Sequence, residues 1–542
     1  MRYNSFIIFV MFLILMSFIF PTRDFARANT NHVDGWKQHT IINNSLEKSE
    51  NSPMDLSNES SEKGLFPYNI VTTVYGDPTS EIAFTWHTKN KGNSDIQYIA
   101  KTTDSPDFST PLENVGDIKK NVEEIGGYSH QVHLKNLIPG TTYWYRVGDK
   151  STDTWSEIAT FTTTQKQNKT SFLYITDSQG SKESDYEISS NTVKQGVQSL
   201  KNVDFILQTG DLVNHSKSPD EWFWLFNSGK YEFMNYAWSA VPGNHDAWSY
   251  TFSQHFYYNY PSVAKDFLKK GVYYSFDHGP AHFVALNTND QSRRPLNSTQ
   301  INWLKQDLSN ARANGAKWLV VFFHKGIFTG GAHADSEEID VLRKQLAPIF
   351  ESYQVDVILQ GHDHSYFRSK IMNGLSPSQN IKITNEDGRE TIFDPKGQSY
   401  HVINTTGTKF YDAKSQNTLN RLGVYPEKVA QPYKQMFAGV TITEDRFCFD
   451  AYSYDAKSVP SDVEIFDAYS IVKSDRAIQL RNEIEHTLAT QSLIKEEKIL
   501  NLMNQYRTLD PAIQSYVTNY SELEKEVRLL KSNGLVSDNK KN

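Results

Sequence analysis

The chain has 542 residues, of which 22% are charged and 38% are hydrophobic, a balance typical of a globular protein with large cores. Its formal net charge of −8 disfavours nonspecific binding to nucleic acid or to anionic lipid. Cys448 is the single cysteine, so no disulfide can form within the chain and hydrophobic cores must stabilise the fold. The length predicts roughly two to four domains.

Residues 1–28 are predicted to be a secretory signal peptide. Arg2 precedes an apolar run over residues 6–20 that only Ser17 interrupts, and the small-x-small pattern Ala26-Arg27-Ala28 follows. The alternative, an uncleaved membrane anchor, would need about 20 apolar residues. We therefore expect an exported protein with no membrane span after signal removal, secreted and with cell-wall association as a further option.

Residues 29–63 are rich in Asn, Ser, Glu and Lys and are predicted to be a disordered linker. Residues 64–166 then contain short alternating strands, such as 81–86 and 142–147, separated by turn residues. This pattern predicts an all-β sandwich. The run Leu137–Tyr143 resembles the tyrosine corner of a fibronectin type III-like domain. We expect this sandwich to serve packing and spacing, with a carbohydrate- or wall-binding role as the alternative.

Residues 167–460 are predicted to carry the chemistry, because five predicted strands there each end in a polar cluster. The clusters are Asp177, Gly210-Asp211, Gly243-Asn244-His245-Asp246, His324 and Gly361-His362-Asp363-His364. Helix-like segments separate the strands, which predicts a sheet covered on both faces. Ligands of such sheets collect at the carboxyl ends of the strands. Five clusters at strand ends therefore predict one shared site.

The mixture of carboxylate, amide and imidazole groups suits a pair of metal ions. Two neighbouring cations repel each other, and the carboxylate of Asp211 could bridge them. Metal ions about 3.5–4 Å apart can hold an oxyanion and lower the pKa of a shared water. Hydrolysis of a phosphate ester suits such a site best. His245 would then be free to protonate the leaving oxygen, and Asp246 beside it is expected to orient the imidazole.

In this order, the five clusters resemble the motif blocks of the calcineurin-like metallophosphoesterases. The sandwich in front makes the chain resemble the purple acid phosphatase branch, and the resemblance covers roughly residues 66–455. It implies an α/β four-layer sandwich of central β-sheets flanked by helices.

The resemblance also implies roles for individual residues. One metal would take Asp177, Asp211 and His364, and the other would take Asp211, Asn244, His324 and His362. His245 would contact the phosphate, and His333 would be a further histidine that contacts the substrate.

Two positions depart from the family pattern. The purple branch has a tyrosine where this chain has Asn214, and the wider superfamily has a histidine where this chain has Gln179. Each residue could offer a metal ion an amide oxygen instead. We therefore expect no tyrosinate colour and a labile first metal, with Fe, Zn and Mn as alternatives for the two ions.

The rest of the chain is predicted to complete the sheet and add a helical module. Residues 400–408 and 436–442 are predicted strands. Apolar residues recur at helical spacing within residues 470–535, which predicts a small module of three helices. Asp510-Pro511 marks a break between two of them.

The leading hypothesis is a secreted binuclear-metal phosphoesterase that hydrolyses phosphate monoesters. Metal-bound hydroxide would attack phosphorus, and His245 would assist the leaving group. A phosphodiesterase or nucleotidase of the same superfamily is the alternative within this chemistry. A hypothesis from another class is a non-catalytic surface-binding protein on a decayed phosphatase scaffold, which the complete Gly243–Asp246 cluster disfavours. The expected partner is a small phosphate-ester substrate.

Overall fold

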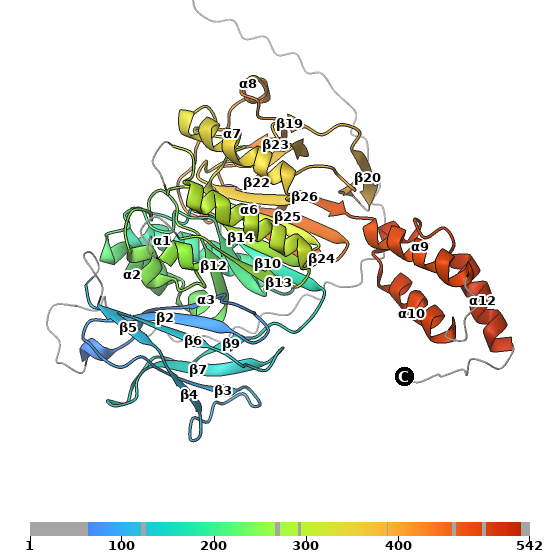
Figure 1. Cartoon of the computed structure of the whole chain (residues 1–542). Coiled ribbons are helices and arrows are strands. Elements are labelled where there is room, and N and C mark those ends of the chain that lie inside the picture. Colours follow the sequence, from blue (N-terminus) through green and yellow to red (C-terminus); the bar gives the residue numbers. More distant parts are fainter. Residues whose placement is uncertain are drawn as a thin grey trace, which may run out of the picture. The chain divides into compact units, whose positions relative to one another are not determined.

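The computed structural model, drawn in Figure 1, describes seven stretches of the chain. They are residues 63–120, 126–265, 272–290, 294–386, 388–457, 462–489 and 495–532. The predicted signal peptide and all but the last residue of the predicted linker lie outside them. Within these stretches, no helix combines the length and the apolar character needed to cross a membrane.

The N-terminal domain is a β-sandwich, as predicted. One layer consists of β4 (Leu112–Val115), β3 (Asp95–Ala100), β7 (Thr142–Asp149), β8 (Thr154–Trp155) and β9 (Ala159–Thr162). The other consists of β1 (Tyr68–Thr73), β2 (Ile82–Thr88), β6 (Tyr128–Leu134) and β5 (Asp117–Lys120). Buried aromatic residues such as Trp86 and Phe161 fill the space between them. The backbone N–H of Ile138 donates to the hydroxyl of Tyr143 at 3.0 Å, as the predicted tyrosine corner requires.

The sandwich and the following domain share one sheet. Strand β1 pairs in parallel with β12 (Ala237–Ala240), with Thr72 opposite Ala237. The result is a twelve-stranded sheet in the order β20-β21-β26-β25-β24-β10-β11-β12-β1-β2-β6-β5. Its remaining strands are β10 (Lys169–Ile175), β11 (Phe205–Gln208), β20 (Lys382–Glu386), β21 (Arg389–Phe393), β24 (Gln435–Thr443), β25 (Arg446–Tyr454) and β26 (Glu464–Val472).

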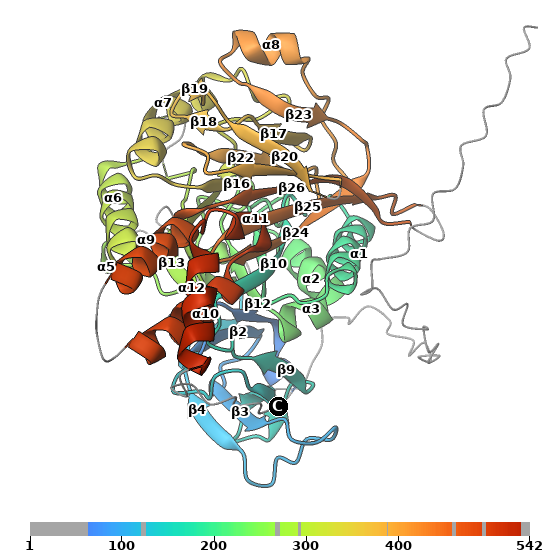
Figure 2. The same ribbon diagram turned by 90° about the vertical axis from the view of Figure 1, so that its right-hand side faces the viewer.

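A second sheet of seven strands faces the first. Its order is β13 (Tyr274–His278), β14 (Ala281–Ala285), β15 (Trp318–Lys325), β16 (Val357–Gly361), β22 (Ser399–Val402), β17 (Tyr366–Ser369) and β23 (Pro426–Ala430). Helices α1 (Glu183–Ser199), α2 (Pro219–Ser228) and α3 (Lys230–Asn235) lie on one side of the two sheets, and α6 (Ser298–Ala313) and α7 (Glu337–Ser352) on the other (Figure 2). This arrangement confirms the predicted four-layer sandwich. The short elements are η1 (Lys63–Leu65), α4 (Thr251–His255), α5 (Ser262–Lys265), β18 (Met372–Asn373), β19 (Ser376–Pro377) and α8 (Gln416–Arg421).

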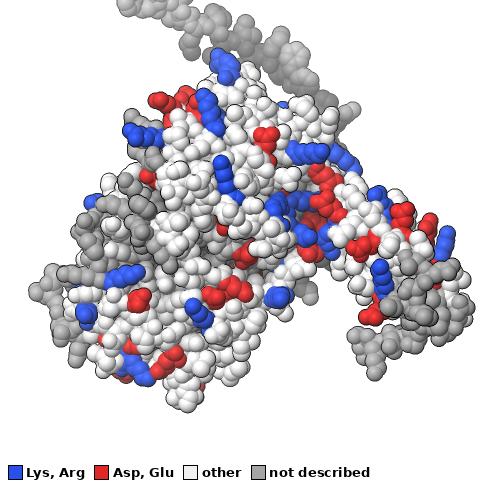
Figure 3. Space-filling view, in the orientation of Figure 1, with Lys and Arg blue, Asp and Glu red and all other residues white. Residues whose placement is uncertain are grey.

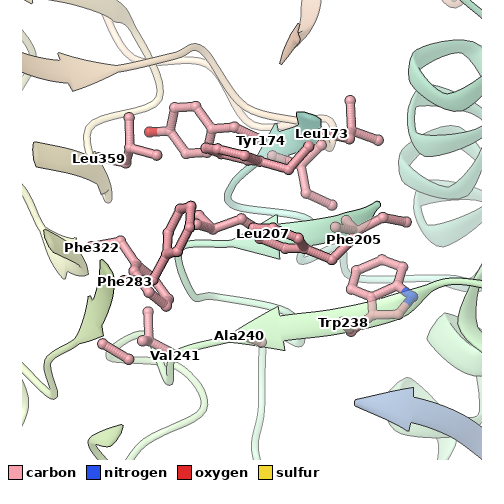
Figure 4. Close-up of a cluster of buried hydrophobic side chains, with 14 of the residues drawn as sticks. Leu173, Tyr174, Phe205, Leu207, Trp238, Ala240, Val241, Phe283, Phe322 and Leu359 are labelled. Carbon is pink, nitrogen blue, oxygen red and sulfur yellow. The ribbon is translucent and has the colours of Figure 1, made fainter. Parts of the chain in front are cut away.

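Aromatic side chains join the two sheets (Figure 4). Phe205 of the first sheet meets Phe283 of the second edge to face, with ring centroids 5.3 Å apart. The hydroxyl of Tyr174, in β10, donates a hydrogen bond to the carbonyl of Gln360, in β16. This bond ties the two sheets together just before the strand ends at which the site forms.

Two predictions for the C-terminal part need correction. Residues 400–408 were predicted to be one strand, but β22 ends at Val402 and a loop follows. The predicted helical module begins at residue 470, yet β26 continues the sheet to Val472. Only Lys473 and Ser474 separate the strand from the first helix of the module, so the boundary is short and the prediction placed it a few residues early. The helices are α9 (Asp475–Ala489), α10 (Lys495–Thr508), α11 (Pro511–Gln514) and α12 (Tyr520–Ser532).

The helical module contacts the end of the large sheet. Arg446 in β25 binds the carboxylate of Asp510, with its Nε and Nη2 atoms 2.6 Å and 2.8 Å from the two oxygens. Asp510 also caps α11 by accepting from the N–H of Ala512. Phe393 and Val472 of the sheet belong to the same hydrophobic core as the helices.

His282 in β14 supports a prediction about stability. Burial alone would lower the pKa of His282, but hydrogen bonds to Asp277 and Asp307 raise it to about 9. This pKa is higher in the folded state than its ordinary value of 6.5. The interaction of His282 with the two aspartates therefore stabilises the fold fully below about pH 6.5 and progressively less as the pH rises through 9. We expect His282→Gln to lower the free energy of unfolding by about 2 kcal/mol at pH 6 and by much less at pH 10.

Urea unfolding of both proteins at several pH values measures this difference. Glu187→Gln, at an exposed position of α1, is the control and should leave the free energy of unfolding unchanged. A loss for His282→Gln that is the same at pH 6 and pH 10 would contradict the ion-pair explanation.

Candidate metal centre

Four of the predicted site residues have a left-handed backbone conformation. The φ angles are +53° at Asp177, +54° at Asp211, +79° at His362 and +43° at His364. Residues other than glycine seldom adopt this region, and each instance costs on the order of 1–3 kcal/mol. Such strain is concentrated at functional sites. All four residues follow the carboxyl ends of β10, β11 or β16.

Two glycines allow these strand ends to approach each other. A Cβ atom on Gly243 would lie 2.0 Å from Oδ1 of Asp211, and one on Gly361 would lie 2.3 Å from Oγ1 of Thr176. Both distances are too short for any side chain. The glycines of the two sequence clusters are therefore needed because backbone and ligand side chains meet there.

The predicted ligands form two groups that share one residue. Asp177, Asp211 and His364 make one group, and Asp211, His324 and His362 make the other, each with its ligand atoms within 4.8 Å of one another. Asp211 belongs to both and is 1% exposed. The structure thus brings together the residues expected to hold two ions, with Asp211 placed where a bridging ligand is needed.

His324 lies at the centre of the second group. Its Nε2 atom is 3.0 Å from Oδ1 of Asn244, 3.2 Å from Nδ1 of His362 and 3.2 Å from Oδ2 of Asp211. Its Nδ1 atom donates to the carbonyl of Thr209 at 2.9 Å, which directs the lone pair of Nε2 at the group. Lone pairs that converge in this way suit a cation, so the donor set fits a metal ion.

The first group is held in a similar way. Nε2 of His364 is 3.2 Å from Oδ1 of Asp177, and its Nδ1 atom donates to the carbonyl of Lys409 at 2.9 Å. The amide nitrogen of Gln179 lies 3.2 Å from Oδ2 of Asp211 and 3.5 Å from Nε2 of His364. Its amide oxygen is buried without a hydrogen-bond partner. Turning the amide over would aim this oxygen at the group, so Gln179 fits as an additional ligand.

The buried charged groups of the site shift one another's pKa values. Burial alone would raise the pKa of Asp211, but the neighbouring His324 lowers it below its ordinary value. Burial would lower the pKa of His324, but Asp211 and Asp177 raise it to about 9. Burial and the charge of His324 lower the pKa of His362. The carboxylates therefore stay ionised and attract cations.

His245 lies at the open side of the second group. Its Nδ1 atom donates to the carbonyl of Asn214 at 2.7 Å, and its Nε2 atom is 4.0 Å from Oδ2 of Asp211. One third of the side chain is exposed. Because a carbonyl oxygen can only accept, Nδ1 keeps its proton and Nε2 is the atom that exchanges one with a ligand.

The expected role of Asp246 needs correction. Its carboxylate accepts hydrogen bonds from the backbone N–H groups of Leu212, Val213 and Gly243, and it forms no hydrogen bond or ion pair with the His245 ring. Since the backbone after Asp211 turns sharply, its N–H groups need a buried acceptor, and Asp246 provides it. Burial and the charge of Asp211 raise the pKa of Asp246 to about 6. Asp246 is a positioning residue for the loop.

The carboxylate that orients a histidine is Asp363, which the sequence analysis did not assign a role. Its Oδ1 atom accepts from Nδ1 of His333 at 2.8 Å, and its Oδ2 atom accepts from Thr329 and Gly331. The ring of His333 lies 4.0 Å from that of His362, centroid to centroid. His333 therefore reaches the site. The only sequence signal for Asp363 was its place between two predicted ligands.

The structure does not bring Asn214 to the two groups as a ligand. Its Oδ1 atom accepts from the ammonium of Lys409 at 2.6 Å, and its amide nitrogen faces His215. Lys409 lies in the loop after β22, directly behind the predicted strand at residues 400–408, and the sequence analysis assigned it no role. Asn214 thus holds a cation where the purple branch is expected to have a tyrosine.

The comparisons with known proteins agree with this geometry. Residues 170–366 match the calcineurin-like phosphoesterase family, and residues 67–163 match the purple acid phosphatase N-terminal domain. The chain is 27% identical over 344 residues to purple acid phosphatase 23 of Arabidopsis thaliana, covering 58% of this chain and 72% of that protein. It is 26% identical over 372 residues to acid phosphatase type 7 of Homo sapiens, covering 63% of this chain and 78% of that protein.

Solved structures share the fold. The purple acid phosphatase PPD1 from yellow lupin seeds superposes with a TM-score of 0.61 at 15% identity, over 75% of this chain and 74% of that one. PhoD superposes with a TM-score of 0.55 at 11% identity, over 77% of this chain and 92% of that one. The sequence matches and the paired ligand groups lead to one conclusion. The chain is a calcineurin-like metallophosphoesterase with a purple acid phosphatase N-terminal domain.

Proposed function

We propose that the protein is an exported phosphatase that hydrolyses phosphate monoesters at a pair of metal ions. The observation that carries this proposal is the carboxylate of Asp211, which two groups of buried ligands share. A site for a single ion would not need a second set of ligands on the other side of the same carboxylate.

The residues divide between two ions of the Fe, Zn or Mn type. Asp177, Asp211, His364 and the amide of Gln179 would hold the first ion; Asp211, Asn244, His324 and His362 would hold the second. When bound, such ions neutralise phosphate charge and lower the pKa of water so that it can attack phosphorus.

Side chains at the open side of the site would bind the phosphoryl group and supply the proton for the leaving group. His245 and His333 can donate to the phosphoryl oxygens, since Asn214 and Asp363 hold their Nδ1 atoms and leave Nε2 free. As the bond between phosphorus and the ester oxygen breaks, Nε2 of the His245 imidazolium gives its proton to that oxygen. Water supplies the new oxygen on phosphorus, and the products are an alcohol and inorganic phosphate.

A phosphodiesterase is the second candidate. Both reactions use the same ligands, and the difference lies in the charge of the substrate, because a monoester is a dianion near neutral pH and a diester a monoanion. The ammonium of Lys409, which the side chain of Asn214 holds near His245, favours the dianion.

The proposal includes that the protein is exported and that nucleic acid is not its partner. The apolar run at residues 6–20 and the Ala26-Arg27-Ala28 pattern support export. On the face drawn in Figure 3, basic and acidic side chains of the described residues are interspersed, without a continuous basic area. Fractionating an expressing culture and sequencing the N-terminus of the secreted form would test export; retention in cells would contradict it.

Metal content tests the shared carboxylate. We expect about two ions per chain in the wild type, fewer than about 0.3 in Asp211→Ala, and about one in His362→Ala, because only Asp211 serves both groups. Elemental analysis of the dialysed proteins measures this. Asp107→Ala, in an exposed loop of the sandwich, is the control and should keep both ions. Equal metal content in Asp211→Ala and the wild type would refute the shared site.

Hydrolysis of esters with different leaving groups tests His245. Nitrophenolate leaves without a proton, whereas an alkoxide needs one, so the role of a proton donor depends on the ester. We expect His245→Gln to reduce kcat for glycerol phosphate about a hundredfold more than kcat for p-nitrophenyl phosphate, with both ions retained. An equal loss for both esters would assign His245 to phosphate binding alone. His362→Ala should abolish hydrolysis of both.

A further inference from the structure

The loop after β22 carries a lysine at the edge of the metal centre. Lys409 donates its ammonium proton to Oδ1 of Asn214 at 2.6 Å, while the carbonyl of Asn214 accepts from Nδ1 of His245 at 2.7 Å. One residue therefore holds both the ammonium and the expected proton donor. Both side chains are partly exposed, so a ligand that reaches His245 also comes close to Lys409.

The position of Lys409 is fixed by the metal ligands themselves. Its carbonyl accepts from Nδ1 of His364 at 2.9 Å, and the N–H of Tyr411 donates to the carbonyl of His364 at 3.3 Å. Four residues before Lys409, Thr405 donates its hydroxyl to the carbonyl of Asp177 at 2.6 Å. The loop is thus anchored to one predicted ligand at each end, which fixes the backbone of Lys409 beside the site.

The charge of Lys409 has no carboxylate partner within ion-pair distance among the described residues. Two other lysines near the site differ in this respect. Lys325 pairs with Glu338 at 2.5 Å, and Lys414, in the same loop, pairs with Asp335 at 3.1 Å. Lys409 is held by a neutral amide instead, so its charge remains available to an anionic ligand.

We propose that Lys409 binds a phosphoryl oxygen of the substrate and that it sets the preference for dianionic monoesters over diesters. This rests on the proposed function. A tyrosinate at position 214 would cancel the ammonium, whereas Asn214 orients it and leaves its charge intact. A diester offers one negative charge less and carries a second ester group at the oxygen that the ammonium would bind.

The variants Lys409→Gln and Lys414→Gln test this inference. Lys414→Gln is the matched control, because it removes an ammonium from the same loop that is already paired. For Lys409→Gln we expect the ratio of kcat/KM for p-nitrophenyl phosphate to that for bis-p-nitrophenyl phosphate to fall about tenfold or more. The dissociation constant of inorganic phosphate, measured by calorimetry, should rise by a similar factor. Lys414→Gln should change neither, and Lys409→Arg should retain most of both.

The outcomes separate this inference from the proposed function. An unchanged ester ratio and unchanged phosphate affinity in Lys409→Gln would overturn the role of Lys409 while leaving the phosphatase intact. Loss of metal ions in Lys409→Gln would also overturn it, since the lysine would then act only through His364. If the wild type hydrolyses neither ester, the proposed function fails. Phosphate binding to the metal-loaded protein still decides whether Lys409 holds the anion.

Discussion

The repulsion between two neighbouring cations is the constraint on which the site depends. One carboxylate shared by both ligand groups would reduce this repulsion. Asp211 can serve both ligand groups only if the ends of β10 and β11 in one sheet meet those of β15 and β16 in the other. The facing aromatic core and the bond from Tyr174 to Gln360 hold the two sheets at that separation. The strained backbone at four predicted ligands is tolerated because this packing holds the strand ends in place.

In several histidines of the site, the ring nitrogen that points away from the ligand groups matters as much for the orientation of the ring as the one that points toward them. Carbonyl oxygens of Thr209 and Lys409 accept from His324 and His364, and each bond fixes which ring nitrogen keeps its proton. The same device appears at His245, where the acceptor is the carbonyl of Asn214. Backbone carbonyls cannot change protonation state, so they hold the imidazoles in one orientation over the whole pH range.

The candidate ligands could be identified in the sequence because each follows an apolar strand, a pattern that is visible without knowledge of packing. The roles of Asp246 and Asp363 could not, because both are carboxylates beside a histidine in sequence and only the turn geometry decides which one reaches an imidazole. Lys409 was missed for another reason. It lies far from the motifs along the chain, in a loop whose isoleucine and threonines favour a strand by composition. The alternation of strands and helices predicted a sheet covered on both faces, and the family resemblance implied the four layers. Periodicity gave no signal that the sandwich shares a sheet with the catalytic domain.

That shared sheet constrains the order of folding. Strand β1 is made first, but one of its two neighbours, β12, follows only after the whole sandwich and two further strands have been made. A chain that emerges from its amino end therefore cannot complete the edge of β1 early, and the unpaired edge stays open to other strands in the meantime. The sandwich and the catalytic domain should consequently become stable together, as one cooperative unit.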